Sequence, residues 1–556
     1  MTRVAVLQFA TTLDVAENLE TCCRMIDQAA EVNPDVMVLP EFCNALSWYE
    51  SQQQAFELAV SLDGEFVKTL ASKAAQHKTY LVVNVTVRRH PLMVEQISVT
   101  SLLFDRRGRL VHQADKQTLM GHENFFFQRA KQRAGVYSSD TGRLGIFACR
   151  DGVTFETARG LAIDGAQLFC DSLNSFALDE ARLHVPSRAV ENGVFMAAAN
   201  KVGPLIPEDQ LAQVAEQTGI PERFLMGAGQ SQIVSPSGEV LAMAPYNQEA
   251  FVWADVDLSE VAANTRPDGS KLLQLRRPEL YTELSVNPAQ QEYQSSARPV
   301  IAAMLAPVGY PQQRMQTVLE NIVDEAFDVM VLAEGCFDDA NYSLTDLVGT
   351  LKQALADSAK YVCFSFKQAS GIRAILVGSE GVVASQGLLH PSQRYGDAEL
   401  AGDIGVHQLP FGKVALFCGD DGHIPESVKV AALKGAQLIL YPFSLQQAWE
   451  NQLALPSRSA ENRVAIVASS YHKVRMGGLI CSLETDFTLL TPWSDRQFDG
   501  HINQPPMVLQ GADGEITQCK IPLQAANNKL MSADTDLLAD RPFHLCERLI
   551  AQRVSA

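Results

Sequence analysis

A cysteine that follows a short apolar run is the first candidate for a nucleophile. Cys149 ends the run 144–148, and a helical pattern begins a few residues later. A cysteine at such a strand-to-helix turn lies near a helix N-terminus, where partial positive charge favours the reactive thiolate. The alternative is that Cys149 is a small buried hydrophobic side chain without chemistry.

Two charged residues could assist that thiol. Glu41 follows the apolar run 36–40, so it stands at the carboxyl end of an expected buried strand, where α/β sheets place their ligand crevice. A partly desolvated carboxyl group there has a raised pKa and could accept the thiol proton. Lys116 could supply a positive charge. Taken alone, Glu41 could equally be a solvated loop glutamate, and Lys116 an ordinary surface lysine.

The elements that must position these residues alternate in type along the chain. Four short apolar runs predict buried strands: 36–39, 80–85, 144–147 and 194–199. Four amphipathic stretches predict helices: 19–30, 66–76, 155–164 and 187–192. This alternation predicts an α/β fold in which helices cover sheets.

The second half of the sequence repeats the first. Matching segments recur in the same order: 35–41 as 328–334, 144–168 as 414–438, and 185–192 as 455–462. Ordered self-similarity of this kind predicts the duplication of one domain. The polar, proline-flanked segment 287–299 predicts a linker, so we expect domains at 1–286 and 300–556.

In this order and setting, Glu41, Lys116 and Cys149 resemble the Glu–Lys–Cys triad of the nitrilase superfamily of carbon–nitrogen hydrolases. Six stretches look like the successive blocks of that family: 39–42, 115–119, 147–152, 188–192, 229–238 and 276–281. The resemblance covers both copies and implies two tandem α-β-β-α sandwich domains. Because members of the family commonly pair their protomers, it also implies that the two copies pair within the chain as a pseudo-dimer.

The resemblance implies a mechanism as well. Glu41 would take the thiol proton, Cys149 would attack an amide carbon to form a thioester, and Lys116 would stabilise the oxyanion. Glu123 matches a second glutamate of the family and would position the substrate. No metal and no organic cofactor is implied.

The residues after the cysteine bear on the substrate. The segment 149–152, Cys-Arg-Asp-Gly, is similar to the Cys-x-Asp-Gly of aliphatic amidases and formamidases and differs from the Cys-Trp-Glu of true nitrilases. A small linear amide is therefore the expected substrate. The alternatives are a nitrilase, a carbamoyl-amide hydrolase, a glutaminase or acyl transferase of the same superfamily, or a non-catalytic binding or scaffold protein.

The second copy is expected to be inactive. In the internal alignment Gly419 meets Cys149, and Cys418 falls one residue early, so that its side chain should point away from the crevice. The segment 383–394, which corresponds to the lysine block, contains no lysine. Only Glu334 keeps its place, and a lone glutamate is no catalytic site.

The composition indicates which partners are disfavoured and in which cellular compartment the protein is expected. Forty-five Lys and Arg against 64 Asp and Glu give a net charge of −19, so nucleic acids and anionic membranes are poor candidate partners. No secretory signal and no apolar run of membrane-spanning length is found. Eleven scattered cysteines without a C-x-x-C pair favour reduced thiols, so a cytoplasmic protein is expected. The pattern leaves a homo-oligomer open.

Overall fold

The computed structural model describes residues 1–263, 265–288, 298–338, 342–368, 370–473 and 476–552. The chain divides into two compact units, and each includes residues from both halves of the sequence. Unit 1 contains Met1–Asn264, Asp486–Ile502 and Leu530–Leu549; unit 2 contains Thr265–Thr485, Asn503–Lys529 and Ile550–Ala556. Of the predicted linker 287–299, residues 289–297 lie outside the described residues.

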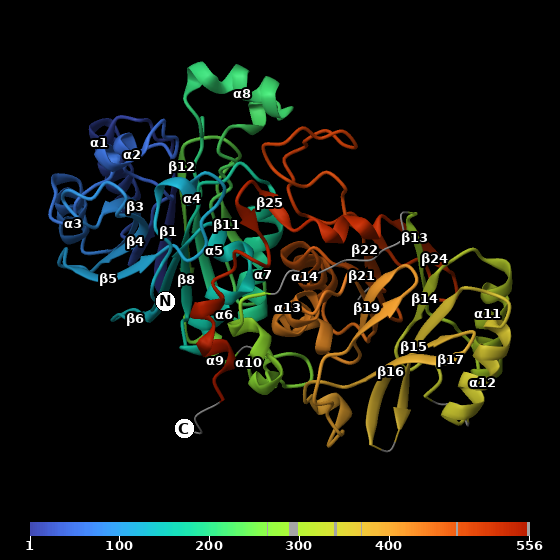
Figure 1. Ribbon diagram of the computed structural model, residues 1–556. Coiled ribbons are helices and arrows are strands. Elements are labelled where there is room, and N and C mark those ends of the chain that lie inside the picture. The colour runs from blue at the N-terminus through green and yellow to red at the C-terminus, as the bar shows by residue number, and fades with distance from the viewer. Residues whose placement is uncertain (264, 289–297, 339–341, 369, 474–475, 553–556) are drawn as a thin grey trace. The chain divides into compact units, whose positions relative to one another are not determined.

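Unit 1 is built on two six-stranded sheets (Figure 1). The first has the order β12-β1-β2-β3-β4-β5, with β1 at Thr2–Gln8, β2 at Val36–Val38, β3 at Tyr80–Arg88, β4 at Ile97–Phe104, β5 at Leu110–Asp115 and β12 at Ala250–Val256. The second has the order β11-β10-β9-β8-β7-β6, with β6 at Val136–Ser138, β7 at Arg143–Ala148, β8 at Leu168–Ser172, β9 at Phe195–Ala199, β10 at Gln232–Val234 and β11 at Val240–Met243. The central strands of each sheet, β1-β2-β3 and β7-β8-β9, are parallel.

Helices cover the outer faces of these sheets. The described α-helices of unit 1 are α1 (Val15–Ala29), α2 (Gln52–Leu58), α3 (Glu65–His77), α4 (Glu123–Phe126), α5 (Arg150–Val153), α6 (Phe155–Ile163), α7 (Val185–Asn192), α8 (Leu211–Thr218), α9 (Glu260–Ala263) and most of α15 (Glu547–Ile550). Helix α1 begins earlier than the pattern predicts, because the Asp14 carboxylate accepts hydrogen bonds from the N–H groups of Ala16 and Glu17 and caps it. Its buried face, with α3, packs on the first sheet.

Unit 2 repeats this architecture. One sheet has the order β17-β16-β15-β14-β13-β24, with β13 at Val300–Leu305, β14 at Val329–Leu332, β15 at Tyr361–Gln368, β16 at Gly371–Gly378, β17 at Gly381–Gly387 and β24 at Thr517–Ile521. The other has the order β18-β19-β20-β21-β22-β23, with β18 at Val406–Leu409, β19 at Gly412–Leu416, β20 at Leu438–Pro442, β21 at Ala465–Ser469, β22 at Leu479–Cys481 and β23 at Met507–Leu509. Its helices are α10 (Leu272–Leu275), α11 (Pro311–Asp324), α12 (Leu344–Leu355), α13 (Pro425–Leu433) and α14 (Leu455–Asn462).

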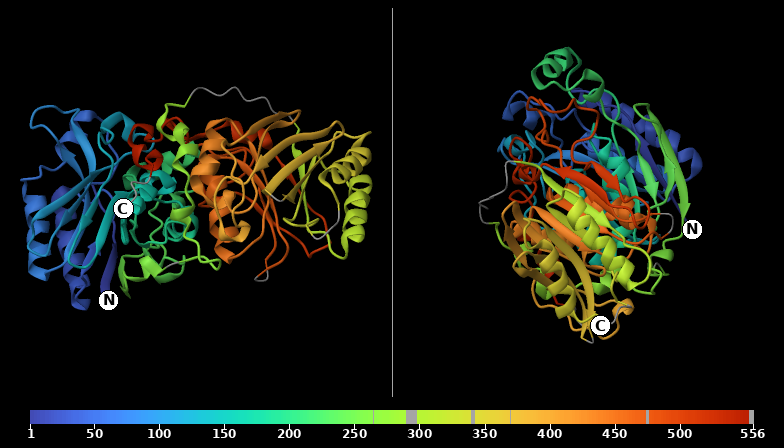
Figure 2. Two further views of the ribbon diagram at one scale, coloured as in Figure 1. Left: turned by 90° about the horizontal axis from the view of Figure 1, so that it is seen from below. Right: turned by 90° about the vertical axis from the view of Figure 1, so that its right-hand side faces the viewer.

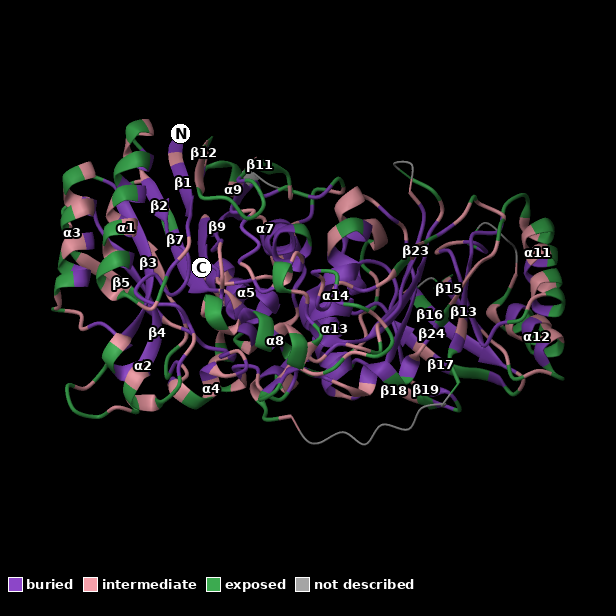
Figure 3. Ribbon diagram, turned by 90° about the horizontal axis from the view of Figure 1, so that it is seen from above, coloured by how far each residue is buried: buried purple, intermediate pink, exposed green. Residues whose placement is uncertain are grey.

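Apolar side chains separate the layers of unit 2. Val331, Leu376 and Leu416 belong to a cluster that fills the space between its two sheets. Val318 and Leu351 belong to another, between the first of these sheets and α11 and α12. Figure 2 shows α11 and α12, in yellow, on the outer face of the sheet, and Figure 3 shows the buried strands against the exposed outer sides of these helices.

The strand orders correspond position by position. Strand β13 pairs antiparallel with β24 and parallel with β14, as β1 pairs with β12 and β2. The predicted fold class, two tandem α/β sandwich domains with layers α-β-β-α, is therefore confirmed. The carboxyl ends of β2, β5 and β7 place Glu41, Lys116 and Cys149 at the ends of three strands of unit 1. None of the described helices combines the length and the apolar character that a membrane crossing requires.

Candidate active site

Glu41 and Lys116 meet in the interior of unit 1. Lys116 Nζ lies 2.7 Å from Glu41 Oε1, and the lysine and glutamate side chains are 0% and 1% exposed. Burial raises the pKa of Glu41 to about 7, although the charge of Lys116 opposes the shift. A carboxyl group that titrates near neutral pH can both take and give a proton there, as a general acid–base catalyst must.

Glu123 contacts the same lysine. Lys116 Nζ donates hydrogen bonds of 2.9 Å to both carboxylate oxygens of Glu123, the first residue of α4. The Met120 N–H also donates to Glu123, at 2.9 Å. Burial disfavours the charge of Lys116, but the carboxylates of Glu123 and Glu41 outweigh it and raise the lysine pKa. The predicted residues therefore place an ammonium group, whose charged form is favoured, between two carboxyl groups.

Cys149 lies at a strained turn between β7 and α5. Its φ of 47° is in the left-handed region, which costs a residue with a side chain about 1–3 kcal/mol. The Cys149 N–H donates to Asp171 Oδ1 on β8 at 2.8 Å and so holds the turn. The turn brings Cys149 to the wall of a cavity of about 150 Å³.

Burial favours the neutral form of the Cys149 thiol. Burial raises its pKa and the charge of Glu41 adds to the shift, while Lys116 opposes it. The direction of this shift is opposite to the effect expected of a helix N-terminus, which favours the thiolate. Helix α5 spans only Arg150–Val153, too short for a strong dipole to offset burial.

Asp151 ties the cysteine turn to the lysine strand end. Its carboxylate accepts hydrogen bonds from the N–H groups of Gln117 and Thr118, at 2.9 and 2.8 Å. Burial raises the pKa of Asp151 to about 6, although these N–H groups oppose the shift. At Gly152 an added Cβ would lie 2.8 Å from an Asp171 carboxylate oxygen. The Asp-Gly of the motif thus fixes the local backbone.

The cavity at Cys149 combines a few polar groups with apolar walls. Glu123, Arg150, Asn174 and Glu180 line it together with the cysteine. Apolar side chains from several elements make up most of the remaining lining, among them Trp48, Met120, Phe176 and Leu205. A cavity of this kind accepts a small molecule that carries one polar reactive group and an apolar remainder.

Two of these polar residues, Glu180 and Arg150, are not among the site residues predicted from the sequence. Burial, with the neighbouring Asp179, raises the pKa of Glu180 to about 8. Arg150 is 2% exposed, and its Nε and Nη1 have no hydrogen-bond partner among the described residues. Sequence reasoning missed Glu180. The sequence feature that could have indicated it is the acidic pair at 179–180, in the otherwise apolar stretch 176–181.

The equivalent turn of unit 2 carries glycine. Gly419 follows β19 with a φ of 61°, and its N–H donates to Glu334 Oε2 at 3.1 Å. A Cβ added there would lie 2.6 Å from Leu388 Cδ1 and 2.9 Å from Tyr395 Cε2. Unit 2 therefore has no room for a nucleophilic side chain at this position. Cys418 is buried in the cluster between the two sheets.

Leucine stands where unit 1 has the lysine. Asp421 accepts hydrogen bonds from the N–H groups of residues 389 and 390, at 3.0 Å each. Asp151 accepts the equivalent pair in unit 1. The register shared by the two units therefore assigns Leu388 to the position of Lys116.

The retained glutamate of unit 2 has a different cation. Burial raises the pKa of Glu334 to about 7, while Arg394 opposes the shift, with its Nη2 at 3.1 Å from Glu334 Oε1. Tyr395 donates to the same oxygen at 2.9 Å. Arg394 also pairs with Asp420 at 2.9 Å, and Arg266 pairs with Asp420 at the same distance. A network of ion pairs thus occupies this site.

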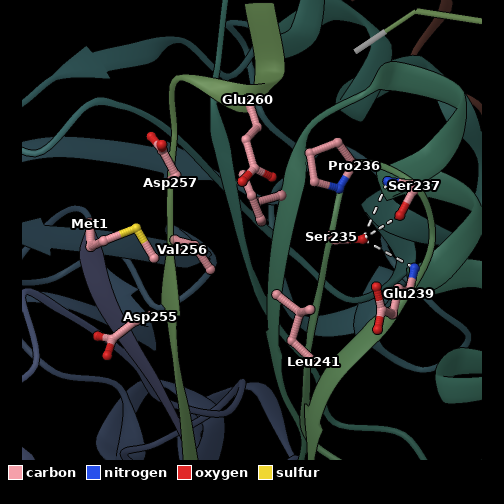
Figure 4. Close-up of a pocket in the computed structure, with 11 residues that line it drawn as sticks. Met1, Ser235, Pro236, Ser237, Glu239, Leu241, Asp255, Val256, Asp257 and Glu260 are labelled. Carbon is pink, nitrogen blue, oxygen red and sulfur yellow. Dashed lines mark hydrogen bonds between the residues drawn. The ribbon is translucent and has the colours of Figure 1, made fainter. Parts of the chain in front are cut away.

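A second hollow of unit 1, of about 390 Å³, lies at the surface between the β10–β11 turn and β12 (Figure 4). Its lining includes Glu239, Asp255, Asp257 and Glu260, and it shares no residue with the cavity at Cys149. Its described lining holds no cysteine or lysine. In the part of the chain that the structure describes, no group of three or more His, Cys, Asp or Glu side chains is arranged to hold a metal ion.

Comparison with known proteins gives the family of the first half. Residues 3–266 match the carbon–nitrogen hydrolase family. A nitrilase of Pyrococcus abyssi is 27% identical over 284 residues, 50% of this chain and 99% of its own. The N-carbamoylputrescine amidase of Solanum tuberosum is 24% identical over 293 residues, 50% of this chain and 94% of its own. A solved structure, that of the NitN amidase from Nesterenkonia sp. AN1, is 24% identical, with a TM-score of 0.40, over 50% of this chain and 98% of that chain. Residues 3–266 of this chain are thus identified by the family match as a carbon–nitrogen hydrolase domain.

Proposed function

We propose that unit 1 hydrolyses a small linear amide through a thioester on Cys149. The observation that carries the proposal is the buried pair of Glu41 and Lys116, 2.7 Å apart, near a cysteine that lines a largely apolar cavity. The family match supports hydrolysis of a carbon–nitrogen bond outside peptides.

The first half-reaction forms the thioester. The Cys149 thiol gives its proton to the Glu41 carboxylate as the sulfur attacks the amide carbon. The carbonyl oxygen becomes an oxyanion, and the Lys116 ammonium stabilises it. The carbon–nitrogen bond then breaks as Glu41 returns the proton to the leaving nitrogen, and the acyl group stays on sulfur.

The second half-reaction consumes water. Glu41, again a carboxylate, takes a proton from a water molecule that attacks the thioester carbon. The carbon–sulfur bond breaks, the acid leaves, and the proton on Glu41 restores the thiol. Glu123 holds Lys116 through two 2.9 Å hydrogen bonds and lines the cavity, so it positions both the ammonium and the substrate.

Unit 2 is proposed to be inactive. Leu388 cannot stabilise an oxyanion, and Gly419 has no nucleophile. Ion pairs of Arg394 with Glu334 and Asp420 occupy the remaining site and support a structural role for it.

A substrate panel tests the proposal. The full chain is incubated with linear amides, nitriles and N-carbamoyl compounds, and released ammonia is measured beside Cys149→Ala. We expect turnover of amides by the parent protein alone. Amide turnover that persists in Cys149→Ala would contradict the mechanism, and turnover of nitriles or carbamoyl compounds alone would replace the substrate class.

The chain-level assignments are proposals of the same kind. Domain boundaries at 1–286 and 300–556 predict first cleavage within 287–299 in limited proteolysis, and cleavage elsewhere would contradict them. Pairing of the two copies within the chain, with or without a larger homo-oligomer, is tested by mass measurement in solution and by cross-linking. Cytoplasmic localisation is tested by fractionation of cells that express the protein.

A further inference from the structure

We propose that two segments from the C-terminal half of the sequence, 486–502 and 530–549, form a wall of the cavity at Cys149 and select the acyl group of the substrate. The substrate class is an amide with an apolar acyl chain. The inference rests on the proposed amide hydrolysis for its substrate, and on the packing of unit 1 for the wall.

Both segments belong to the same compact unit as residues 1–264. Leu489 and Leu490 come from the first segment, with Ile502 at its end, and Met531 and Ser532 come from the second. All five line the cavity that Cys149 also lines. Figure 1 shows the second segment through β25 (Leu530–Ser532), drawn in red among the blue and green elements of unit 1.

The wall is part of an apolar core. Leu489, Ile502 and Met531 are each no more than 5% exposed and share one buried cluster with Ile206 and Val214. Burial of side chains of this size stabilises a contact by about 1.5–3 kcal/mol each. The two segments are therefore part of the packed apolar core of unit 1.

Hydrogen bonds fix the second segment to the loop that carries Glu123. Thr535, on β26 (Thr535–Asp536), accepts a hydrogen bond from the Gly121 N–H at 2.7 Å. The Asn124 side chain donates to the Asp534 carbonyl at 2.9 Å. Arg129 pairs with Asp540 at 2.8 Å. These contacts hold the backbone on either side of Glu123.

The first segment is fixed beside Glu180. The Ile502 N–H donates to the buried carboxylate of Asp179 at 2.7 Å, and the Leu178 N–H donates to the Gly500 carbonyl at 2.8 Å. Since Glu180 lines the cavity, these bonds place Ile502 and the polar lining in one rigid arrangement.

The wall sets the chemistry of the acyl group. Charged and amide side chains of the lining come from residues 123, 150, 174 and 180, whereas residues 489, 490, 502 and 531 contribute only apolar side chains and Ser532 a hydroxyl group. An apolar cavity of about 150 Å³ holds a molecule the size of benzene, so an acyl chain of up to about six carbons fits. The carbonyl group then faces Cys149 and the chain faces the wall.

The test is a chain-length series on the full-length enzyme. We measure kcat/KM for straight-chain amides from two to eight carbons with Met531→Ala, Leu489→Ala and the control Leu530→Ala. Leu530 is the neighbour of Met531 on β25 but is 45% exposed and does not line the cavity. A methylene in an apolar pocket changes kcat/KM by about tenfold or more, so each wall variant should shift the ratio of long to short amides by about tenfold toward the long ones. Leu530→Ala should leave the ratio unchanged.

A second measurement does not depend on amide turnover. Methyl and hexyl methanethiosulfonate are reacted with each variant, and the labelling rate of Cys149 is followed by peptide mass spectrometry. The two wall variants should raise the hexyl-to-methyl rate ratio relative to Leu530→Ala. Amide turnover in the parent with neither ratio changed in the wall variants would overturn the inference alone. If the parent hydrolyses no amide, the proposed function fails and the labelling ratio decides whether the wall exists.

Discussion

The two strand-end sites of the molecule keep the same glutamate and differ in everything that acts with it. Burial raises the pKa of Glu41 and of Glu334 to about 7 in each case. The cation is Lys116 in unit 1 and Arg394 in unit 2. If unit 2 is inactive, as proposed, a buried carboxyl group with a cation is not in itself a catalytic site. Unit 1 differs in having Cys149 at the strained turn and Lys116 at the neighbouring strand end, where unit 2 has Gly419 and Leu388.

The residue that follows the turn has opposite charge in the two units. Unit 1 has Arg150, whose Nε and Nη1 lack a hydrogen-bond partner among the described residues. Unit 2 has Asp420, and although burial opposes the shift, Arg266 and Arg394 hold its pKa well below the usual range. In unit 2 the charge at this position forms ion pairs with Arg266 and Arg394 at 2.9 Å, whereas Arg150 Nε and Nη1 in unit 1 lack hydrogen-bond partners among the described residues.

The substitution Cys149→Gly copies unit 2 into unit 1 and should have the largest effect. Turnover should be abolished, because the nucleophile is gone. Since glycine adopts the left-handed φ of this turn without strain, Cys149→Gly should be more stable than Cys149→Ala by about 1 kcal/mol. Activity assays and denaturant unfolding measure the two effects. A Cys149→Gly protein that still hydrolyses amides would break the comparison.

The substitution Lys116→Leu gives unit 1 the residue that unit 2 has at the lysine position. Loss of an oxyanion donor should lower kcat by about 10²–10³-fold or more. Removal of the cation also leaves Glu41 and Glu123 buried without it, at a cost of about 3–5 kcal/mol, so thermal unfolding should be measured alongside.

Lys116→Arg and Arg394→Lys serve as matched controls for the lysine. Lys116→Arg keeps the charge and should fold, yet still lose most activity, because a guanidinium does not replace a compact ammonium. Arg394→Lys in unit 2 should leave kcat unchanged. A loss of activity in Arg394→Lys as large as in Lys116→Leu would mean that unit 2 takes part in catalysis.

The pH dependence separates the two glutamates. In the free enzyme kcat/KM should rise with pH as Glu41 ionises near pH 7, because only the carboxylate accepts the thiol proton. Both carboxyl groups have folded pKa values above the usual value of about 4.3, so their contribution to stability is present in full below that value and is lost as pH rises through about 7.

Glu334→Gln should reduce that loss of stability between pH 5 and pH 8 and leave the pH profile of kcat/KM as it is. Glu41→Gln should instead abolish the activity. Stability measured by unfolding at several pH values, and rates over the same range, give the answer. A shifted rate profile in Glu334→Gln would show that the two sites are coupled.

Much of this arrangement follows from the sequence, and the reason is local. The alternation of apolar runs and amphipathic stretches predicts β2, β3, β7 and β9 and the helices between them, and the repeat predicts the same strand order twice. Strand ends are where such folds place polar residues, so Glu41, Lys116 and Cys149 could be expected to gather there.

Other features depend on contacts that no local pattern reports. The assignment of Leu388 to the lysine position needs the two hydrogen bonds to Asp421, since the surrounding sequence has diverged. The raised pKa of the Cys149 thiol comes from burial among distant elements. Membership of 486–502 and 530–549 in unit 1 joins residues hundreds of positions apart, which periodicity cannot predict.

The smallest effect is expected at the second candidate thiol. Cys418 is buried between the sheets of unit 2, and burial raises its pKa. Cys418→Ala should therefore leave kcat and KM within experimental error and lower the stability of the protein by about 1 kcal/mol. Loss of half the activity per chain would mean that both copies are catalysts.

The most direct test of the account is the number and place of acyl groups on the enzyme during turnover. The full chain is mixed with a saturating linear amide, quenched in acid within milliseconds, and analysed by intact mass and peptide mapping. We expect at most one acyl group per chain, attached to Cys149 and absent from Cys149→Ala. An acyl group on Cys418 or on any other side chain, or two acyl groups per chain, would contradict the claim that one unit carries the chemistry alone.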